Sequence, residues 1–271
     1  FTLKENRNFQ LNGTIMAGKM AFYGSNFVFT YEDFKINLQN VDSLSMKVYL
    51  GEIDNYGKKV YTDVASLIEN LTGEVLIDKP DNKSGRKQYP EYPIFKSKEK
   101  SYVYYDDVAI QQGVFKKEDF YFEIVPFTLD SINDLRKEGI NLDGKFVSAG
   151  IFPPFDHALK IQEDVSLGFI KQTPASGYPV FGGKGTFHNT IDMSNKGLFC
   201  DGKLKYLTSL SQSNKFAMFP DSVNANTQRF NISRQTSGTR YPMTKSFDNY
   251  RHWQPYQGVF CVYIEGGRVS M

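Results

Sequence analysis

The sequence lacks an excess of charge of either sign. Its 32 Lys and Arg residues nearly balance its 30 Asp and Glu residues, which leaves a net charge of +2. A protein that binds nucleic acid is expected to gather a basic excess on one face, and this balance provides no such excess. We therefore predict no nucleic-acid partner.

Long apolar runs and metal-ligand patterns are also missing. No window approaches 18 consecutive apolar residues, so the sequence predicts no transmembrane helix. The three histidines and two cysteines show no metal-ligand spacing, and we predict neither a metal nor a cofactor. Cys200 and Cys261 are expected to be buried free thiols, with a disulfide as the alternative in an oxidising compartment.

Aromatic residues, by contrast, are abundant. The chain has 23 Phe and 17 Tyr together with 22 Gly and 11 Pro, which is typical of many strands separated by turns. Apolar and aromatic residues recur at every second position, as in Phe27–Tyr31 and Phe120–Ile124, and this is the period of a β-strand. After Glu32 and Asp33 the phase shifts, which indicates a new strand or a bulge. The sequence therefore predicts an all-β protein.

Two short stretches break the strand pattern. From Val64 to Leu71 apolar residues fall at i, i+3, i+4 and i+7, which predicts an amphipathic helix over residues 62–71. A second, shorter helix is predicted over residues 131–139, capped by its first serine and ended by its last glycine.

The domain organisation is predicted to be simple. The sequence opens on Phe1 rather than Met, within strand-forming sequence, so we expect residues 1–271 to be a single β-rich segment of a longer protein. A weak division is expected near residue 170, where the loop at 172–179 precedes a glycine cluster.

A glycine-centred strand motif recurs along the chain. It reads apolar, polar, Gly, polar, apolar, and its glycines are Gly13, Gly73, Gly144 and Gly202, spaced 60, 71 and 58 residues apart. A glycine inside a strand permits a bend or a close backbone approach. Such units must stack on neighbours to bury their apolar faces, which favours a solenoid-like sheet, with chance recurrence as the alternative.

A second motif pairs Asp with Ser after an aromatic strand. Its aspartates are Asp42, Asp130 and Asp221, spaced 88 and 91 residues apart. An Asp-Ser pair can accept hydrogen bonds from turn amides, so we expect each pair to mark a turn at the end of a strand.

The segment from Leu11 to Phe29, with its Gly-containing strand and Phe-Tyr-Gly strand, resembles the repeats of bacterial envelope proteins of the AsmA/TamB kind. The stretches 178–185, 194–198, 219–222 and 253–256 are similar to parts of very large envelope proteins of the Bacteroidota.

The resemblance implies an elongated, twisted sheet of the β-taco or β-helix kind. It further implies a non-enzymatic structural or assembly segment in the periplasm or on the cell surface, related to lipid or outer-membrane assembly. Its partners would be other segments of the same chain, other envelope proteins, lipid or glycan. Long polar insertions and the predicted helix depart from the family pattern and put an uninterrupted lipid conduit in doubt.

Catalytic motifs give no support to an enzyme. No G-x-S-x-G elbow is present. His157, His188 and His252 each lack a nearby metal-ligand partner, and the adjacency of Asp156 and His157 in the sequence does not establish a catalytic hydrogen bond. The glycine cluster at 182–185 lacks the spacing of a phosphate loop. Residues 78–84 gather oxygen ligands, but their interposed lysines make a poor calcium site. We therefore predict no catalytic residues.

Aromatic residues beside prolines suggest a binding role as the alternative function. They would form a platform for a carbohydrate or a protein, or else pack as staples within their loops. These residues are Tyr89, Tyr92, Tyr178, Trp253 and Tyr256. A polysaccharide-cleaving β-helix enzyme is a third, less favoured hypothesis.

Overall fold

The protein is built from β-strands. The computed structural model describes residues 1–234, 243–263 and 269–270. Strands account for 59% of the structure, and no described helix reaches seven residues. The predicted all-β class is confirmed, whereas the two predicted helices are not found.

The chain forms two compact units, each assembled from three stretches of sequence. Unit 1 comprises residues 1–104, 121–145 and 156–167, and unit 2 comprises residues 105–120, 146–155 and 168–271. The chain passes between the units five times, and the last of these crossings, between Leu167 and Gly168, lies close to the division expected near residue 170. The four earlier crossings were not expected from the sequence.

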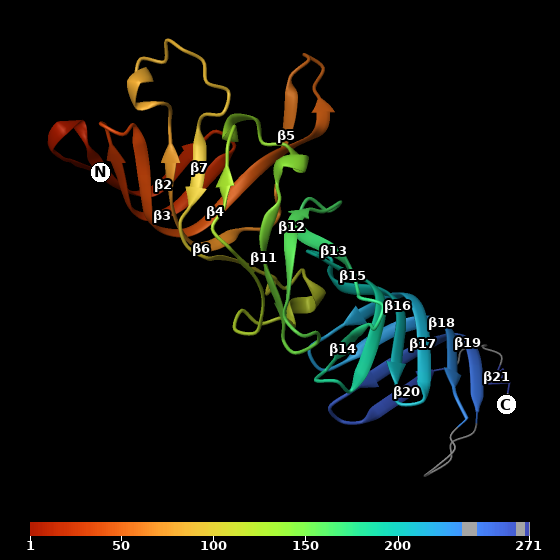
Figure 1. The fold of residues 1–271 in the computed structure, drawn as a ribbon. Helices are drawn as coiled ribbons and strands as arrows, with labels where there is room; N and C mark the ends of the chain where they lie inside the picture. The colour runs from red at the N-terminus through yellow and green to blue at the C-terminus, as the bar shows by residue number, and fades with distance from the viewer. Residues whose placement is uncertain (235–242, 264–268, 271) are drawn as a thin grey trace. The chain divides into compact units, whose positions relative to one another are not determined.

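Unit 1 is an open antiparallel sheet (Figure 1). Its central strands, paired in this order, are β2 (Phe9–Ala17), β3 (Met20–Thr30), β4 (Lys35–Ile53) and β6 (Ile68–Leu76). Its shorter strands are β1 (Thr2–Leu3), β5 (Lys59–Asp63), β7 (Ile94–Ser97), β8 (Ser101–Tyr104) and β10 (Thr128–Leu129). The unit also contains most of β9 (Phe120–Ile124) and of β12 (Phe155–Ile161), and the first four residues of β11 (Leu142–Ser148).

The short strands extend the sheet of unit 1 at its edges. β1 pairs with β2, while β7 and β8 share the free edge of β6. β10 then pairs with β7, and β9 pairs with β8. The turn from Tyr31 to Phe34 joins β3 to β4, so the phase shift in the sequence marks the end of one strand and the start of another.

Aromatic side chains fill the inner face of unit 1. Phe22 and Phe27 of β3 and Phe95 of β7 are completely buried, and the ring centroids of Phe22 and Phe95 are 5.0 Å apart. Burial of one such side chain contributes roughly 1.5–3 kcal/mol. These residues therefore provide much of the free energy that stabilises the sheet.

Unit 2 is an antiparallel meander. Its strands are β13 (Leu167–Gln172), β14 (Tyr178–Val180), β15 (Gly185–Ser194), β16 (Gly197–Tyr206), β17 (Ser209–Met218), β18 (Val223–Ile232), β19 (Thr244–Gln254), β20 (Val259–Tyr263) and β21 (Val269–Ser270). Strands β15 to β20 pair in chain order, and β13 and β14 share the free edge of β15. Buried Phe187 and Phe216, with ring centroids 5.9 Å apart, belong to its core.

The four motif glycines all lie inside strands, in β2, β6, β11 and β16. Gly13 and Gly202 have φ values of +120° and +149° and adjoin β-bulges. A Cβ on Gly73 or Gly144 would collide with a carbonyl oxygen of the neighbouring strand. A Cβ on Gly202 would likewise collide with the carbonyl oxygen of His188. Two of the glycines thus adjoin bulges and three lie at close backbone approaches, while a solenoid repeat stays a prediction.

The Asp-Ser pairs do not all mark turns. Asp42 lies in the middle of β4, where the sheet continues past it, so the turn predicted there is wrong. Asp130 follows β10 and leads into a 3-10 turn, and Asp221 lies in the connection between β17 and β18. At Asp221 the carboxylate accepts a hydrogen bond of 2.9 Å from the Ser222 hydroxyl rather than from turn amides.

The helix predicted over residues 62–71 is wrong, because β6 begins at Ile68. Leu67 is 44% exposed, so the four apolar residues do not share one buried face. Asn70 has a φ of +57°, and this left-handed residue shifts the alternation of β6 by one position. Ile68 and Leu71 therefore both face inward, and a bulged strand imitates the spacing of a helix.

The second predicted helix, over residues 131–139, is also wrong. The segment forms two separate 3-10 turns, η4 (Ile132–Asp134) and η5 (Lys137–Gly139). Ser131 is left-handed, with a φ of +50°, and its side chain makes no capping hydrogen bond. Leu135 between the turns is extended, with a ψ of 127°, which interrupts any helix. The other described 3-10 turns are η1 (Glu5–Arg7), η2 (Pro80–Asn82) and η3 (Gln111–Gly113).

The end of β4 and β5 form a hairpin that projects from the sheet of unit 1 (Figure 1). Every residue from 51 to 60 is exposed. Asp54 Oδ1 accepts hydrogen bonds from the backbone amides of Tyr56 and Lys58, at 2.9 and 2.8 Å, and so fixes the turn. The hairpin is thus locally ordered although its tip is surrounded by solvent.

Both cysteines are free thiols. Cys200 is buried and Cys261 is half-buried, so the expectation of two buried thiols is correct for the first and only partly for the second. Burial raises the pKa of the Cys200 thiol well above its ordinary value. Within the described ranges, no helix has the length and apolar character needed to cross a membrane.

Substitution of Gly144 by Ala should destabilise the protein. The new Cβ would collide with the backbone carbonyl of Glu123 and the ring of Phe122, and such overpacking costs about 1–3 kcal/mol. Chemical denaturation should show this as a lower transition midpoint. Gly139→Ala is the matched control, because its Cβ would meet nothing within 4 Å. Equal midpoints for the two variants would contradict the close-approach role of Gly144.

Candidate functional site

Four adjacent strands of unit 2 form a polar groove of about 910 Å³. It spans β17, β18, β19 and β20, which pair so that Asn226 lies opposite Tyr250 and Tyr250 opposite Tyr263. The lining residues are Asn214, Asn226, Thr227, Gln228, Asp248, Asn249, Tyr250, Val262 and Tyr263. Amides and tyrosines dominate this surface.

A change of phase in β19 brings its polar residues to the groove. Ser246 is buried at an even position, whereas Asn249 and Arg251 are buried at odd positions. Asp248 between them has a φ of +50°, and this left-handed residue resets the alternation. Asp248 and Tyr250 are exposed as a result, and both line the groove.

Buried hydrogen bonds hold this bulge in place. The Thr227 hydroxyl lies 2.9 Å from the backbone carbonyl of Asn249 and 3.0 Å from its side-chain oxygen. The Asn249 amide nitrogen donates to the carbonyl of Phe247 at 3.0 Å. Because buried polar groups are costly to leave unpaired, this network fixes the backbone on which Asp248 and Tyr250 are mounted.

Two tyrosines give the groove an aromatic wall. Tyr250 is 40% exposed and Tyr263 is 57% exposed, and their ring centroids lie 5.8 Å apart. A tyrosine ring combines a flat apolar face with a hydroxyl that donates and accepts hydrogen bonds. The pair can therefore contact a ligand that is apolar on one face and hydroxylated at its edges.

The groove carries little charge. Asp248 is the only acidic side chain among its described lining residues, and no lysine or arginine is among them. Asn and Gln side chains each offer both donors and acceptors. The arrangement thus favours a neutral ligand rich in hydroxyl groups over a strongly charged one.

Arg251, the neighbour of Tyr250, is buried among the inward-facing residues of β19. Burial lowers the pKa of its guanidinium to about 10, so it stays charged at neutral pH. Its guanidinium carbon lies 3.6 Å from the Phe230 ring centroid, and Nη2 donates to the Ser246 hydroxyl at 2.8 Å. Cation–π attraction and this hydrogen bond offset part of the cost of burying the charge.

The five aromatics predicted as ligand contacts are divided between the two units. Tyr89 and Tyr92 belong to unit 1, where their rings meet edge to face at 6.4 Å, and the Lys79 ammonium lies 3.7 Å from the Tyr89 ring centroid. Tyr178 of unit 2 stacks on Phe155 at 5.6 Å. Tyr89 and Tyr92 pack as loop staples would, whereas Tyr178 lies in strand β14 rather than in a loop.

The prediction that Trp253 is a loop residue available to a ligand is wrong. It lies inside β19 rather than in a loop and is only 1% exposed. Its ring centroid is 5.4 Å from that of Phe181 and 4.8 Å from that of Tyr206. It cannot contact a ligand at the surface, which counts against the loop-aromatic platform. Tyr256 is 55% exposed but leans edge-on against Phe181 at 6.0 Å.

The groove residues themselves were missed by sequence reasoning. A signal is present in β18, where Asn224, Asn226 and Gln228 alternate with mostly buried residues and thus carry amides on the outer face. Tyr263 gives no such local signal, because it joins Tyr250 only through the pairing of β19 with β20.

The loop considered for calcium uses its oxygens to fold itself. Asp78 accepts hydrogen bonds from the Lys79 amide and from the Asn82 side chain, both at 2.7 Å. The Asn82 side-chain oxygen in turn accepts from the Lys87 amide at 3.0 Å. Across the residues that the structure describes, no three His, Cys, Asp or Glu side chains come together as metal ligands.

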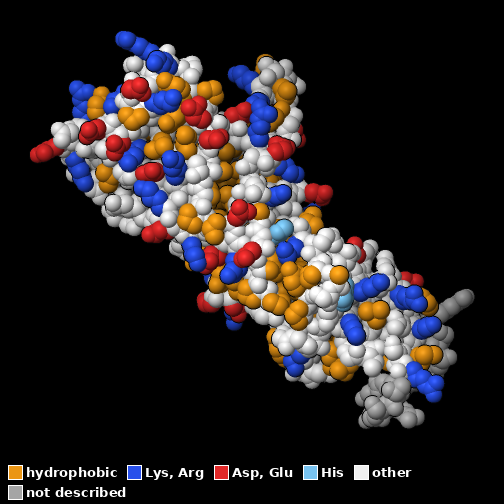
Figure 2. All heavy atoms as spheres, in the orientation of Figure 1, with side chains coloured by type: hydrophobic (Ala, Val, Ile, Leu, Met, Phe, Trp, Pro, Cys, Tyr) orange, Lys and Arg blue, Asp and Glu red, His pale blue; other side chains and the backbone are white. Residues whose placement is uncertain are grey.

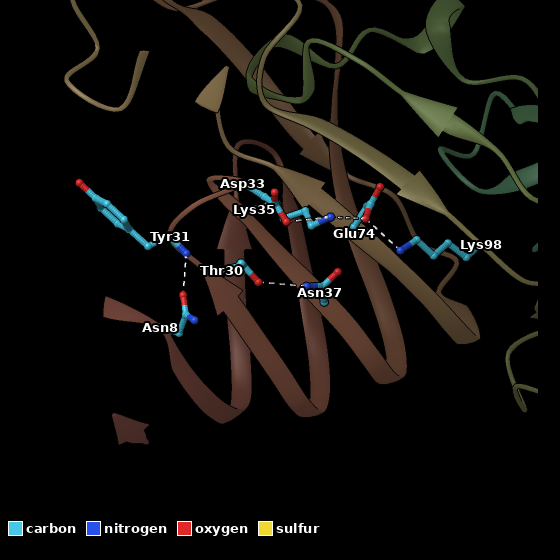
Figure 3. Close-up of polar contacts among 8 residues, drawn as sticks. All are labelled: Asn8, Thr30, Tyr31, Asp33, Lys35, Asn37, Glu74 and Lys98. Atoms are coloured by element: carbon cyan, nitrogen blue, oxygen red, sulfur yellow. Dashed lines mark hydrogen bonds and ion pairs between the residues drawn. The ribbon is translucent and has the colours of Figure 1, made fainter. Parts of the chain in front are cut away.

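The outer surface of unit 1 carries ion pairs that cross its strands. The Glu74 carboxylate of β6 lies 2.9 Å from Lys98 Nζ and 3.5 Å from Lys35 Nζ (Figure 3). Lys35 Nζ also lies 3.4 Å from the Asp33 carboxylate. Burial alone would raise the pKa of Glu74, but the two lysines outweigh it and lower the pKa. Figure 2 shows acidic and basic side chains interspersed on this unit rather than gathered by sign.

A second polar cluster attaches the projecting hairpin to η4. The Asp134 carboxylate accepts hydrogen bonds from Lys59 Nζ at 2.5 Å and from the Tyr61 hydroxyl at 2.6 Å. It also forms an ion pair with Arg136, whose Nη2 lies 3.3 Å away. The hydrogen bond from Lys59, with that from Tyr61, lowers the pKa of Asp134 to about 2. The bond to Asp134 raises the pKa of Tyr61 to about 12. Neither group titrates near neutral pH, and the hydrogen bonds to Asp134 join the hairpin to η4.

Comparisons with protein-family models, with curated proteins and with solved structures found no match to this chain. Its function is therefore argued from the groove and the surfaces described here.

The cluster around Asp134, which joins the hairpin to η4, should stabilise the hairpin less at very low and at very high pH. Asp134 has a lowered folded pKa, so its contribution is present above about pH 3.8 and is lost as the pH falls through about 2. Tyr61 has a raised folded pKa, so its contribution is present below pH 10 and is lost as the pH rises through about 12. The protection of the β5 amides, measured as their exchange rate relative to that of an unfolded peptide at the same pH, should be greatest between these limits.

Asp134→Asn should speed exchange in β5 at pH 7, because the charged hydrogen bond from Lys59 is lost. Asp63→Asn is the control, because Asp63 pairs with Lys47 on the same hairpin but is 75% exposed, and such pairs contribute little. Unchanged exchange in Asp134→Asn would show that the cluster does not hold the hairpin.

Proposed function

We propose that this chain is a non-catalytic β-scaffold that binds a neutral carbohydrate in the groove of unit 2. The observation that carries the proposal is the pair of half-exposed tyrosines facing a wall of amides, with one carboxylate among the described lining residues. Sugars present hydroxyl groups at their edges and C–H groups on their faces. Amides and tyrosine rings complement these two kinds of surface.

The dimensions of the groove agree with a ligand site. Its volume of about 910 Å³ lies within the range of roughly 300–1,000 Å³ found for small-molecule sites. The Thr227–Asn249 network fixes the bulge that presents Tyr250, so that residue is ordered before a ligand arrives. Such preorganisation reduces the entropy lost on binding.

Binding without cleavage is favoured by the carboxylates of the groove. Hydrolysis of a glycosidic bond ordinarily uses two carboxylic groups placed on either side of the bond. Asp248 has no second carboxylate beside it among the described lining residues. The polysaccharide-cleaving alternative therefore receives no support from this site.

The resemblance to envelope proteins supplies the setting of the proposal. A structural segment of a large extracytoplasmic protein, built on solenoid-like repeats, would meet carbohydrate in the periplasm or at the cell surface. The recurrence of glycine at mid-strand positions in β2, β6, β11 and β16 supports this part of the proposal.

A lipid-handling role is less well supported by the described surfaces. The inward aromatic side chains of each unit pack against one another instead of lining an open apolar groove. Phe22 and Phe95 do so in unit 1, and Phe187 and Phe216 do so in unit 2, all fully or almost fully buried. The polar groove is the surface better suited to a ligand.

Titration of a panel of neutral hexasaccharides by calorimetry tests the proposal. Tyr250→Ala should weaken binding on the order of tenfold, which corresponds to ~1.4 kcal/mol. Asn226→Ala should also weaken it, whereas Tyr250→Phe should retain most of the affinity because it keeps the ring.

Tyr56→Ala is the matched control, because it removes an exposed tyrosine from the hairpin of unit 1. It should bind like the unmodified chain. If no neutral hexasaccharide binds, or if folded Tyr250→Ala binds with unchanged affinity, the proposal for this groove is wrong.

A further inference from the structure

Three tyrosines form a contiguous aromatic cluster in unit 1. Tyr102 and Tyr104 stack with ring centroids 5.9 Å apart and an interplanar angle of 14°. Tyr121 meets both rings edge to face, at 5.7 and 6.3 Å. None of the three is buried, so the cluster is accessible from solvent.

Strand alternation places this tyrosine cluster on the outer face of the sheet. In β8 the tyrosines alternate with buried Ser101 and Val103, and in β9 Tyr121 is flanked by buried Phe120 and Phe122. The pairing of β8 with β9 sets Tyr104 opposite Tyr121. Because the inner face already holds the phenylalanines, the outer rings are not needed to fill the core.

Polar groups surround the tyrosine cluster. The Asn70 amide donates to the Tyr104 hydroxyl at 3.3 Å. Tyr102 lies opposite Glu123, which accepts from Lys100 at 2.7 Å. The cluster thus has hydrogen-bonding groups at its borders, as a carbohydrate site requires.

A depression of about 650 Å³ adjoins the cluster on the same unit. Glu123, which lies opposite Tyr102, and its ion-pair partner Lys100 both line the depression, so the depression begins at the border of the cluster. Its lining residues are Lys100, Glu123, Val125, Asp143, Gly144, Lys145, Asp156, His157 and Ala158.

The charges of the depression have mixed signs. Two lysines and three acidic residues are among its lining residues, so their charges nearly cancel. A polyanion or a polycation would gain little here. A neutral, hydroxyl-rich ligand could instead use both the donors and the acceptors.

We infer that the outer face of unit 1 is a second carbohydrate-binding surface, in which sugar rings lie on the tyrosine cluster and hydroxyl groups reach the adjoining depression. The inference stands on its own residues and holds whether or not the groove of unit 2 binds. It goes beyond the proposed function by giving the chain two separate sites.

The competing explanation is structural. Cross-strand aromatic pairs stabilise sheets by roughly 0.2–1 kcal/mol each, and the tyrosines would then matter only for folding. The two explanations differ in Lys145, which is exposed and lines the depression but has no part in the aromatic cluster.

Calorimetric titration of the full chain with the same neutral hexasaccharides distinguishes a binding role of the tyrosine cluster from a purely structural one. We expect two ligands per chain, falling to one in Tyr121→Ala and remaining two in Tyr121→Phe. Lys145→Ala should weaken one of the two binding steps about threefold or more without a change in melting temperature. Raising sodium chloride tenfold should change the affinity less than threefold, because the charges have mixed signs.

The variants also separate the two sites. Loss of binding only in Tyr250→Ala would leave the groove of unit 2 as the single site and overturn this inference. Loss only in Tyr121→Ala would support the inference and overturn the groove. Unchanged binding in both Tyr121→Ala and Lys145→Ala overturns the inference, and if Tyr121→Ala does not fold, Lys145→Ala decides.

Discussion

Every surface of this protein depends on the two-residue alternation of its strands and on the few residues that reset it. Asn26, Asn70 and Asp248 adopt left-handed backbone inside β3, β6 and β19. Asn and Asp tolerate this conformation better than most residues do. In β3, for example, Phe22 and Phe27 are separated by five positions, yet both are buried because the alternation changes at Asn26. Each reset decides which side chains build the core and which reach solvent.

The same device prepares the outer surfaces. In β19 the reset turns Asp248 and Tyr250 outward, while Asn249 holds the bent backbone through its own amide. In β19 one structural irregularity thus shapes both the core and the groove, which explains how a polar groove occurs on a unit whose inner face is aromatic.

Local patterns could be predicted from the sequence, and non-local ones could not. The alternation of Phe120–Ile124 identifies a strand because it needs no partner to be seen. The helix predicted over 62–71 failed because nothing in the sequence marks Asn70 as left-handed. Trp253 looked like a loop residue beside Pro255, yet β19 continues to the residue before that proline. The groove escaped prediction because Tyr263 reaches Tyr250 only through strand pairing.

The projecting hairpin has a practical consequence. Its tip is exposed throughout residues 51–60, its turn is fixed by Asp54, and its base is held to η4 through Asp134. Exposed turns tolerate inserted sequence best when their flanking strands are anchored. An epitope tag or a peptide acceptor for a fluorophore could therefore replace the turn at Asn55 and Tyr56. Such an insertion would give an attachment point for immobilising the protein through a turn that lies outside the central strands of unit 1.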